Sequence, residues 1–320
     1  MIEKDKSYEI RKYLFEKKIV EEVFDIEEMT GGIHNDVYHI FSDRGELVYK
    51  KHLSISKNFP DIVLPEGRYE NEKNSYELLA KIFSKNVTPK LIYSDDAKKI
   101  IVLEYLEEGN RIDRKINSLE LFDFFAMGEI LAEIANLTYN KNEIASLFDK
   151  SEFQELKYEY RYYKFIENKE LFKIRDDLMK SAKENRSVFS HGDPRFNNIF
   201  AQDDGVYFID FEGAYFADAS LDPSYLLSEI LIYYFSTGKE EFKKMAESFW
   251  KGYIKTLKIN IDMKNLERRI IKHCGFALLD KAIGVIKDDY SFISSEKVIS
   301  RAEEIIISDK IVTFNSLFLK

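Results

Sequence analysis

The spacing of apolar residues changes about a third of the way along the chain. In the first third, short β-prone runs alternate with turn-forming segments and predict two β-hairpins, over residues 36–50 and 91–103. Between the hairpins, apolar residues recur at helical spacing over residues 69–83 and predict one helix. This part of the chain is therefore expected to form a small β-rich lobe that carries a helix.

Beyond residue 119 the apolar pattern is almost wholly helical. The predicted helices cover residues 119–136, 153–165, 171–183, 226–235, 240–258, 266–286 and 295–307. A single pair of strands is predicted in this part of the chain, around residues 191–212. The pattern predicts an α+β fold with a β-rich N-terminal lobe, residues 1–105, and a mostly helical C-terminal lobe, residues 106–320.

Composition narrows the class of protein. The 320 residues suffice for two compact lobes, and an apolar content of 45% argues against disorder. No apolar run approaches 18 residues and the first residues are charged, so we expect neither a membrane span nor a signal peptide. Cys274 is the sole cysteine, which fits the reducing cytoplasm. The net charge of −9 argues against a nucleic-acid partner.

The most informative residues form two short motifs, His191-Gly-Asp-Pro-Arg-Phe-Asn-Asn198 and Phe208-Ile-Asp-Phe-Glu212. They place Asp193 and Asn198 five residues apart on one loop, and Asp210 at the end of a strand-like run. Phosphoryl transfer uses such a set: an acid that accepts a hydroxyl proton, and an amide and a second acid that bind Mg²⁺. Protein kinases carry H-R-D-x-x-x-x-N and then D-F-G, so the match is close without being to a protein kinase.

The two motifs resemble those of small-molecule kinases that share the protein-kinase fold, namely aminoglycoside phosphotransferases, choline and ethanolamine kinases, and methylthioribose kinases. These families carry H-G-D-x-x-x-x-N and then I-D-(F/W/Y)-E or I-D-x-G. The specific motifs span residues 190–222, whereas the resemblance in layout covers nearly the whole chain. The resemblance implies the two-lobed protein-kinase-like fold.

A faint further similarity to methylthioribose kinases lies in residues 274–284. That family usually has a basic pair where Asp280 and Lys281 stand, and its catalytic loop commonly lacks the asparagine found at position 198. We therefore do not assign methylthioribose as the substrate.

The motifs suggest roles for the residues of phosphoryl transfer. Asp193 is the candidate catalytic base, and Asn198 and Asp210 are the candidate Mg²⁺ ligands, because hard cations prefer oxygen. Arg195 lies within the catalytic loop and is a candidate to bind a phosphate or an acidic group of the substrate. An ordinary surface salt bridge is the equally plausible alternative for this arginine.

Three further acids follow the second motif. Glu212 is a candidate to approach the metal or the substrate, and Asp218 is a candidate to line the acceptor pocket. Asp222 is expected to be structural, capping the helix over 226–235 and bonding the catalytic loop. With Asp193, the first two would make an acidic pocket that favours a neutral or cationic acceptor.

A strand lysine can neutralise the nucleotide phosphates, and a helix glutamate can orient it. Lys50 is the candidate because it ends the apolar strand, and Lys51 is expected to face the other way. The family pattern favours Glu72 as the partner of this lysine, with Glu70 as the alternative.

Two backbone segments complete the expected nucleotide site. Gly31 and Gly32 resemble the start of the family's phosphate loop, G-G-x-x-N, where glycine lets backbone N–H groups approach phosphate. A plain hairpin turn is the alternative. Glu104 and Leu106 resemble the hinge between lobes, where a backbone carbonyl and an amide would hold the adenine.

Together these observations predict an ATP- and Mg²⁺-dependent phosphotransferase. Its acceptor would be a hydroxyl of a small polar molecule such as a sugar, an amino alcohol or an aminoglycoside. We expect a cytoplasmic monomer or homodimer with no nucleic-acid or membrane partner. The alternative is a nucleotide-binding pseudokinase that acts as a regulatory module, and the intact set of candidate catalytic residues counts against it.

Overall fold

The computed structural model describes residues 4–29, 34–149, 165–284 and 295–319, together with residues 155, 158, 159, 162 and 290. The chain divides into two compact units. The N-terminal unit comprises Met1–Asn110 and Tyr207–Glu212, and the C-terminal unit comprises Arg111–Val206 and Gly213–Lys320. The short segment 207–212 thus packs with the first unit although it lies far along the sequence.

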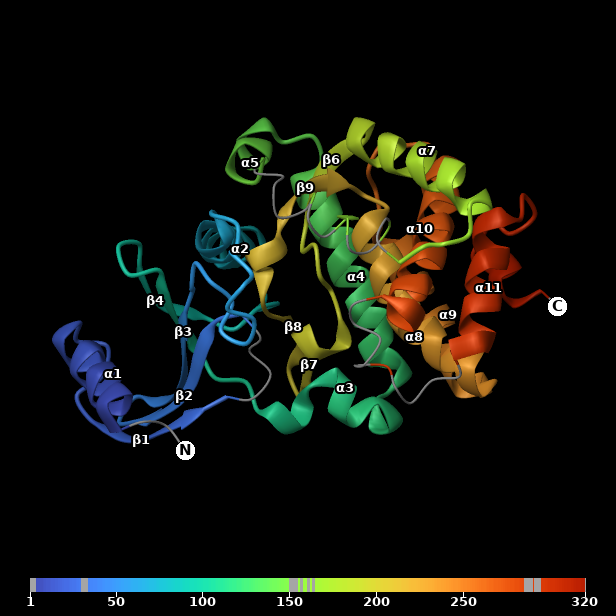
Figure 1. Cartoon of the computed structure of the whole chain (residues 1–320). Helices are drawn as coiled ribbons and strands as arrows, with labels where there is room; N and C mark the ends of the chain where they lie inside the picture. Colours follow the sequence, from blue (N-terminus) through green and yellow to red (C-terminus); the bar gives the residue numbers. More distant parts are fainter. Residues whose placement is uncertain are drawn as a thin grey trace. The chain divides into compact units, whose positions relative to one another are not determined.

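The N-terminal unit is a five-stranded antiparallel sheet with two helices (Figure 1). The elements are α1 (Lys4–Glu16), β1 (Val23–Glu28), β2 (Asp36–Ser42), β3 (Gly45–Lys51), α2 (Arg68–Ile82), β4 (Leu91–Asp95) and β5 (Ile100–Glu104), and the strand order is β1-β2-β3-β5-β4. Both predicted hairpins and the predicted helix are present. The sequence pattern missed α1 and β1, because α1 is largely charged and β1 is mostly exposed.

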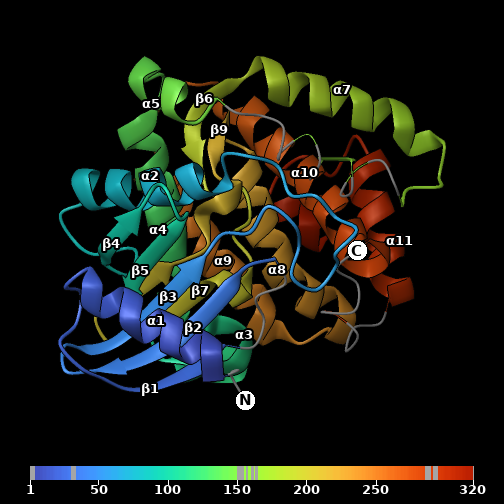
Figure 2. The same cartoon turned by 60° about the vertical axis from the view of Figure 1, so that its left-hand side comes forward.

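The strand period of two divides the side chains of this sheet between its faces. Figure 2 shows α1 lying along the sheet, and its apolar residues Ile10 and Leu14 pack in one core with Tyr49 of β3. The next residue, Lys50, must then face away from α1. Its side chain meets α2 instead, at Glu72.

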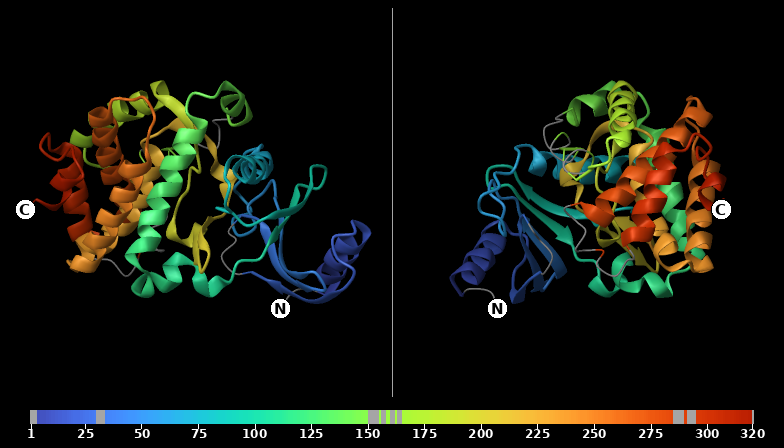
Figure 3. Two further views of the ribbon diagram at one scale, coloured as in Figure 1. Left: turned by 180° about the vertical axis from the view of Figure 1, so that it is seen from behind. Right: turned by 45° about the vertical axis from the view of Figure 1, so that its right-hand side comes forward.

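The C-terminal unit is mostly helical (Figure 3). Its elements are α3 (Ile112–Lys115), α4 (Leu121–Thr138), α5 (Asn142–Leu147), α7 (Glu170–Glu184), β6 (Arg186–Ser190), β7 (Ile199–Gln202), β9 (Tyr215–Asp218), α8 (Leu221–Thr237), α9 (Glu240–Thr256), α10 (Met263–Ile283) and α11 (Ser295–Ile307). Strand β8 (Gly205–Phe208) begins in this unit and ends in the segment 207–212 of the N-terminal unit. The prediction of one strand pair is wrong, because β6 pairs with β9 and β7 pairs with β8. Most of the predicted helix 153–165 lies outside the described residues.

Close helix packing builds the interior of this unit. A Cβ atom at Gly128 of α4 would overlap the carbonyl oxygen of Phe249 in α9, and one at Gly252 of α9 would overlap the carbonyl oxygen of Phe125 in α4. The two glycines therefore let the helix backbones approach each other. α8 is buried along nearly all of Leu221–Ile232, so its polar residues must find partners inside the protein.

The middle of α10 is fully buried. His273 and Cys274 have no exposed surface, and the Tyr162 hydroxyl lies 3.0 Å from Nδ1 of His273. Burial, with a smaller contribution from Arg269, lowers the pKa of His273 from 6.5 to about 3. None of the helices in the described part of the chain has the length and apolar character needed to cross a membrane.

We expect the buried imidazole to make the stability of the protein fall in mild acid. Its pKa is lower in the folded state, so its contribution is fully present above pH 6.5 and is lost as the pH falls towards 3. The loss is at most about 1.4 kcal/mol per pH unit. Urea unfolding of the wild type and of His273→Gln, between pH 7 and pH 4, measures it. The free-energy difference between the two proteins should change with pH, and a constant difference would contradict the prediction.

Candidate active site

The ammonium of Lys50 is the centre of a charged cluster in the N-terminal unit. Lys50 lies on β3 with 7% of its surface exposed. Its Nζ is 2.7 Å from Oε2 of Glu72 and 2.6 Å from Oδ1 of Asp210. Burial alone would lower the pKa of this lysine, but the two carboxylates outweigh burial and raise it. Lys51 is exposed, as the alternation along the strand requires.

Glu72 on α2 is held from several sides. Only 1% of its surface is exposed, and its Oε2 also lies 2.7 Å from Nε2 of His52. Burial would raise the pKa of this carboxyl, but Lys50 and His52 outweigh it and lower the pKa. The alternative candidate, Glu70, forms an ion pair with Lys99 at the surface. The fold therefore places Glu72, and not Glu70, beside Lys50.

The backbone of Asp210 adopts a left-handed conformation, with φ of 67°. This region is uncommon for residues other than glycine, although aspartate tolerates it better than most. Neighbouring bonds hold it there. The amide of Phe208 donates to the carbonyl of Val87 at 2.8 Å, and the amide of Asp210 donates to the Tyr76 hydroxyl at 3.4 Å. These bonds explain why the segment 207–212 belongs to the N-terminal unit.

Glu212 is bound by residues of its own unit. Its carboxylate accepts hydrogen bonds from Arg68 and from Nδ2 of Asn35, the latter at 2.9 Å. Burial would raise the pKa of this carboxyl, but Arg68 and Lys50 hold it well below its usual range. Both of these bonds reach the same oxygen, Oε2. A role of Glu212 toward the metal or the acceptor stays a prediction.

A group with metal-ligand spacing also lies in this cluster. Among the described residues, His52, Glu72 and Glu212 bring one ligand atom each within 4.8 Å of one another. The two carboxylates already face Lys50 and Arg68, so their charge is compensated without a metal ion. We assign no metal to this group.

The catalytic loop connects β6 to β7 in the C-terminal unit. The carbonyl of Asp193 accepts hydrogen bonds from the Arg195 amide at 2.8 Å and from Nδ2 of Asn198 at 3.0 Å. The side-chain amide nitrogen of Asn198 is thus used within the loop, and its Oδ1 is the atom that could coordinate a cation. Nε of Arg195 lies 3.6 Å from Oδ1 of Asp193.

Asp222 fastens the start of this loop to α8. Its carboxylate accepts from the Ser190 hydroxyl at 2.6 Å, the His191 amide at 2.7 Å and the Gly192 amide at 3.1 Å. The expected bond to the catalytic loop is therefore present. The expected helix cap is not, because α8 begins at Leu221 and Asp222 lies within its first turn.

Asp218 is a structural residue. It is 1% exposed, and its two oxygens accept hydrogen bonds from Arg269 at 2.8 and 3.0 Å. Both oxygens of Asp218 are thus engaged by Arg269, which does not support the expectation that Asp218 lines an acceptor pocket. Two of the three acids of the predicted acidic pocket, Glu212 and Asp218, thus each form an ion pair with an arginine.

The remaining candidates belong to the nucleotide site. Gly31 and Gly32 lie outside the described residues. Glu104 is the last residue of β5, and its amide donates to the carbonyl of Lys90 at 2.9 Å. Leu106 follows just beyond the sheet and is half-buried. The hinge role of this segment stays a prediction.

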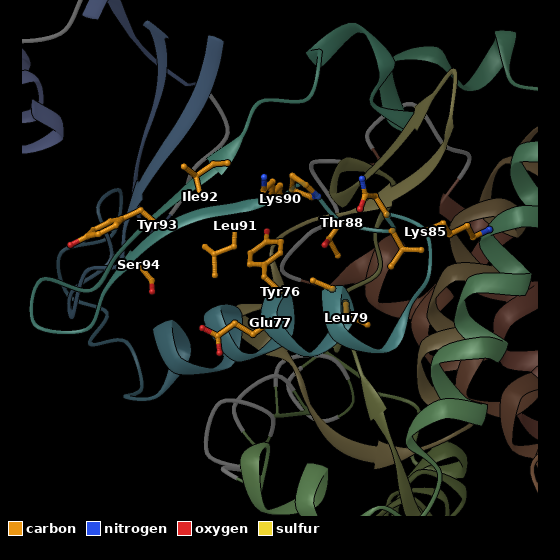
Figure 4. A pocket seen from close by; sticks show the side chains of 14 residues that line it. Tyr76, Glu77, Leu79, Lys85, Thr88, Lys90, Leu91, Ile92, Tyr93 and Ser94 are labelled. Atoms are coloured by element: carbon orange, nitrogen blue, oxygen red, sulfur yellow. The ribbon is translucent and has the colours of Figure 1, made fainter. Parts of the chain in front are cut away.

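A separate pocket of about 560 Å³ lies in the N-terminal unit (Figure 4). It is bordered by Tyr76 and Leu79 of α2 and by residues 85–94. Figure 4 shows Tyr76 standing between Leu91 and Thr88. Lys50 is not among the residues that line this pocket, but Tyr76 lines it and also accepts from the Asp210 amide beside the charged cluster.

Comparison with known proteins identifies the family. The model of the phosphotransferase enzyme family matches residues 25–258. This match covers well over half of the chain, which therefore belongs to the phosphotransferase enzyme family. As a member of that family the protein is an enzyme, a small-molecule kinase. Among curated protein sequences, none matches the chain.

Solved structures share the fold. A choline/ethanolamine kinase family protein from Mesorhizobium loti is 13% identical, with a TM-score of 0.58 over 97% of each chain. A choline kinase from Cryptosporidium parvum is 16% identical, with a TM-score of 0.57 over 98% of this chain and 99% of that chain. An amicoumacin kinase in complex with AMP-PNP and Ca²⁺ is 14% identical, with a TM-score of 0.57 over 97% of this chain and 98% of that chain. At such identities the likeness establishes the two-lobed kinase-like fold alone.

Sequence reasoning missed that Arg68, His52 and Asn35 contact the carboxylates of the charged cluster. Asn35 ends the stretch that resembles the phosphate loop, so a signal for it was present. Arg68 offered none, because its partner Glu212 lies 144 residues away.

We expect Arg68→Met to lower the free energy of unfolding by about 3–5 kcal/mol, because it leaves a buried carboxylate without its cation. Adding Glu212→Gln should recover part of this loss. Urea unfolding followed by circular dichroism measures both variants. Lys73→Met is the control, since its ion pair with Asp96 is at the surface and should be worth at most about 1 kcal/mol. Equal losses for Arg68→Met and the control would contradict the prediction.

Proposed function

We propose that the protein transfers the γ-phosphate of ATP to a hydroxyl group of a small polar molecule, with Mg²⁺ as the metal. The observation that carries this proposal is the placement of one buried lysine between Glu72 and Asp210 within a single unit of a phosphotransferase-family protein. A lysine held in this way presents a fixed positive charge to phosphate oxygens. The bound nucleotides named for related folds, ADP and AMP-PNP, agree with this choice of donor.

The donor atoms present suit Mg²⁺. Asp210 offers a carboxylate and Asn198 offers an amide oxygen, and Mg²⁺ prefers a few hard oxygen ligands together with phosphate. Bound there, Mg²⁺ would neutralise charge on the phosphate oxygens. Gly31 and Gly32 would bring backbone N–H groups to the phosphates, and the backbone of Glu104 and Leu106 would hold the adenine.

Asp193 is the proposed catalytic base. It orients the acceptor hydroxyl and takes its proton as the oxygen forms a bond to the γ-phosphorus, while the bond from that phosphorus to the bridging oxygen of ADP breaks. Arg195 lies beside this carboxylate and would contact the transferred phosphate or an acidic group on the acceptor.

The charge balance bears on the acceptor class. Three acids were expected to form an acidic pocket, and two of them, Glu212 and Asp218, are in ion pairs. The third, Asp193, has the positive charge of Arg195 beside it. We therefore favour a neutral polyol or a sugar over a compound with several positive charges. Amino alcohols with a single charge remain within the proposed class.

ADP release, measured over a panel of sugars, amino alcohols, nucleosides and aminoglycosides, tests the proposal. We expect one group of hydroxyl compounds to stimulate release, and Asp193→Asn to lower kcat by about 10²–10⁴-fold while ATP still binds. Asp203→Asn, at the turn after β7, is the control and should leave kcat unchanged. Near wild-type turnover in Asp193→Asn would remove this residue as the base. Mg²⁺-dependent ATP binding without turnover on any acceptor would favour a regulatory module.

We also expect Lys50→Met to weaken Mg²⁺-ATP binding by about 10- to 100-fold, the usual worth of charge-assisted hydrogen bonds. Lys51→Met is the matched control, because the neighbouring side chain is exposed and should leave the affinity near that of the wild type. Isothermal titration with ATP and Mg²⁺ measures both. The reverse order of effects would show that the strand presents the other lysine to the nucleotide.

A further inference from the structure

Helix α8 carries two carboxylates that reach the catalytic loop. Asp222 and Glu229 are seven residues apart, so they lie on the same side of the helix, about 10.5 Å apart along its axis. Asp222 binds the start of the loop, as described above. Oε2 of Glu229 accepts a hydrogen bond from the Phe196 amide at 3.1 Å. Phe196 lies between Asp193 and Asn198, so one face of α8 binds the loop on both sides of Asp193.

Glu229 is itself held by a fully buried lysine. Glu229 is 2% exposed and Lys281 of α10 is 0% exposed. Nζ of Lys281 lies 3.1 Å from Oε1 of Glu229, donates to the Ser228 hydroxyl at 2.8 Å, and stands 3.6 Å from the ring centre of Tyr225. The Tyr290 hydroxyl donates to the same Oε1. One carboxylate oxygen thus serves the lysine and the tyrosine, and the other serves the catalytic loop.

A buried ion pair of this kind needs an explanation beyond stability. Taking two charges out of water is costly, and well-packed apolar side chains often stabilise a protein at least as well. What apolar side chains cannot supply is a fixed acceptor for the Phe196 amide, which is a buried donor and requires a partner. The ring of Phe196 is also enclosed, between Phe124 and Tyr233. The loop is therefore fixed at this residue through both its main chain and its side chain.

We propose that Glu229, oriented by Lys281, is a positioning residue for phosphoryl transfer. Its hydrogen bond to the Phe196 amide fixes the stretch of loop between Asp193 and Asn198, and so fixes the geometry of the base relative to the metal-binding amide. This inference rests on the proposed function, because it takes the roles of Asp193 and Asn198 from there. Under this proposal turnover also depends on α10, because Lys281 of that helix orients Glu229.

The variants Lys281→Met and Glu229→Leu test the inference. Each should lower kcat by about 10- to 100-fold, the usual effect of a displacement of about 1 Å at reacting groups, with little change in the KM for ATP. The double variant Glu229→Gln/Lys281→Met keeps an oxygen that accepts from Phe196 and removes both charges. It should therefore recover more of the kcat than either single variant shows.

A second buried pair on the same helix is the matched control. Arg269→Met breaks the ion pair of α10 with Asp218, which is as deeply buried but does not touch the catalytic loop. It should lower the free energy of unfolding as Lys281→Met does, while the kcat of the folded enzyme stays near that of the wild type. Equal loss of kcat in Arg269→Met and Lys281→Met would reduce Glu229 to a residue of general stability and overturn the inference.

Hydrogen exchange gives a readout that does not require turnover. In Lys281→Met and Glu229→Leu, peptides that cover residues 193–198 should exchange faster than in the wild type, and those in Arg269→Met should not. Unchanged exchange in both Glu229-pair variants would overturn the inference even if no acceptor were found. A wild-type protein that exchanges as expected but never releases ADP would instead count against the proposed function alone.

Discussion

The N-terminal unit is organised around the positive charge of Lys50. A buried ammonium is stable only with compensating anions, and here one comes from α2 and the other from the segment 207–212. Removing one partner of such a buried group typically costs about 3–5 kcal/mol. Lys50 therefore binds strand, helix and distant segment to one another. The same contacts fix the direction of the lysine that we propose for binding the nucleotide phosphates.

Three further buried carboxylates among the described residues follow the same rule. Glu212 is paired with Arg68, Asp218 with Arg269, and Glu229 with Lys281. Each pair joins elements that are distant in the sequence. Asp193, the third acid of the predicted acidic pocket, has Arg195 beside it.

The loop of residues 191–198 illustrates how a buried helix can hold an irregular segment in place. The loop lies outside the α-helices and strands, and two carboxylates of α8 accept hydrogen bonds from its backbone amides. Because α8 is surrounded by other helices, those carboxylates must themselves be satisfied internally, which is the task of Ser190 for one and Lys281 for the other. The position of the loop in the C-terminal unit therefore depends on how the core around α8 is packed.

The sequence by itself determined the features that depend on local pattern. The alternation of the first strands, the helical spacing after residue 119 and the motif from His191 to Glu212 were enough to predict two lobes and the phosphotransferase family. The partners of Glu212, Asp218 and Glu229 were decided only by the tertiary structure. The pairing of Glu212 with Arg68 spans 144 residues, and that of Asp218 with Arg269 spans 51. A carboxylate in a motif looks the same in sequence whether it faces a cavity or an arginine, because burial and charge compensation arise only when distant elements pack together.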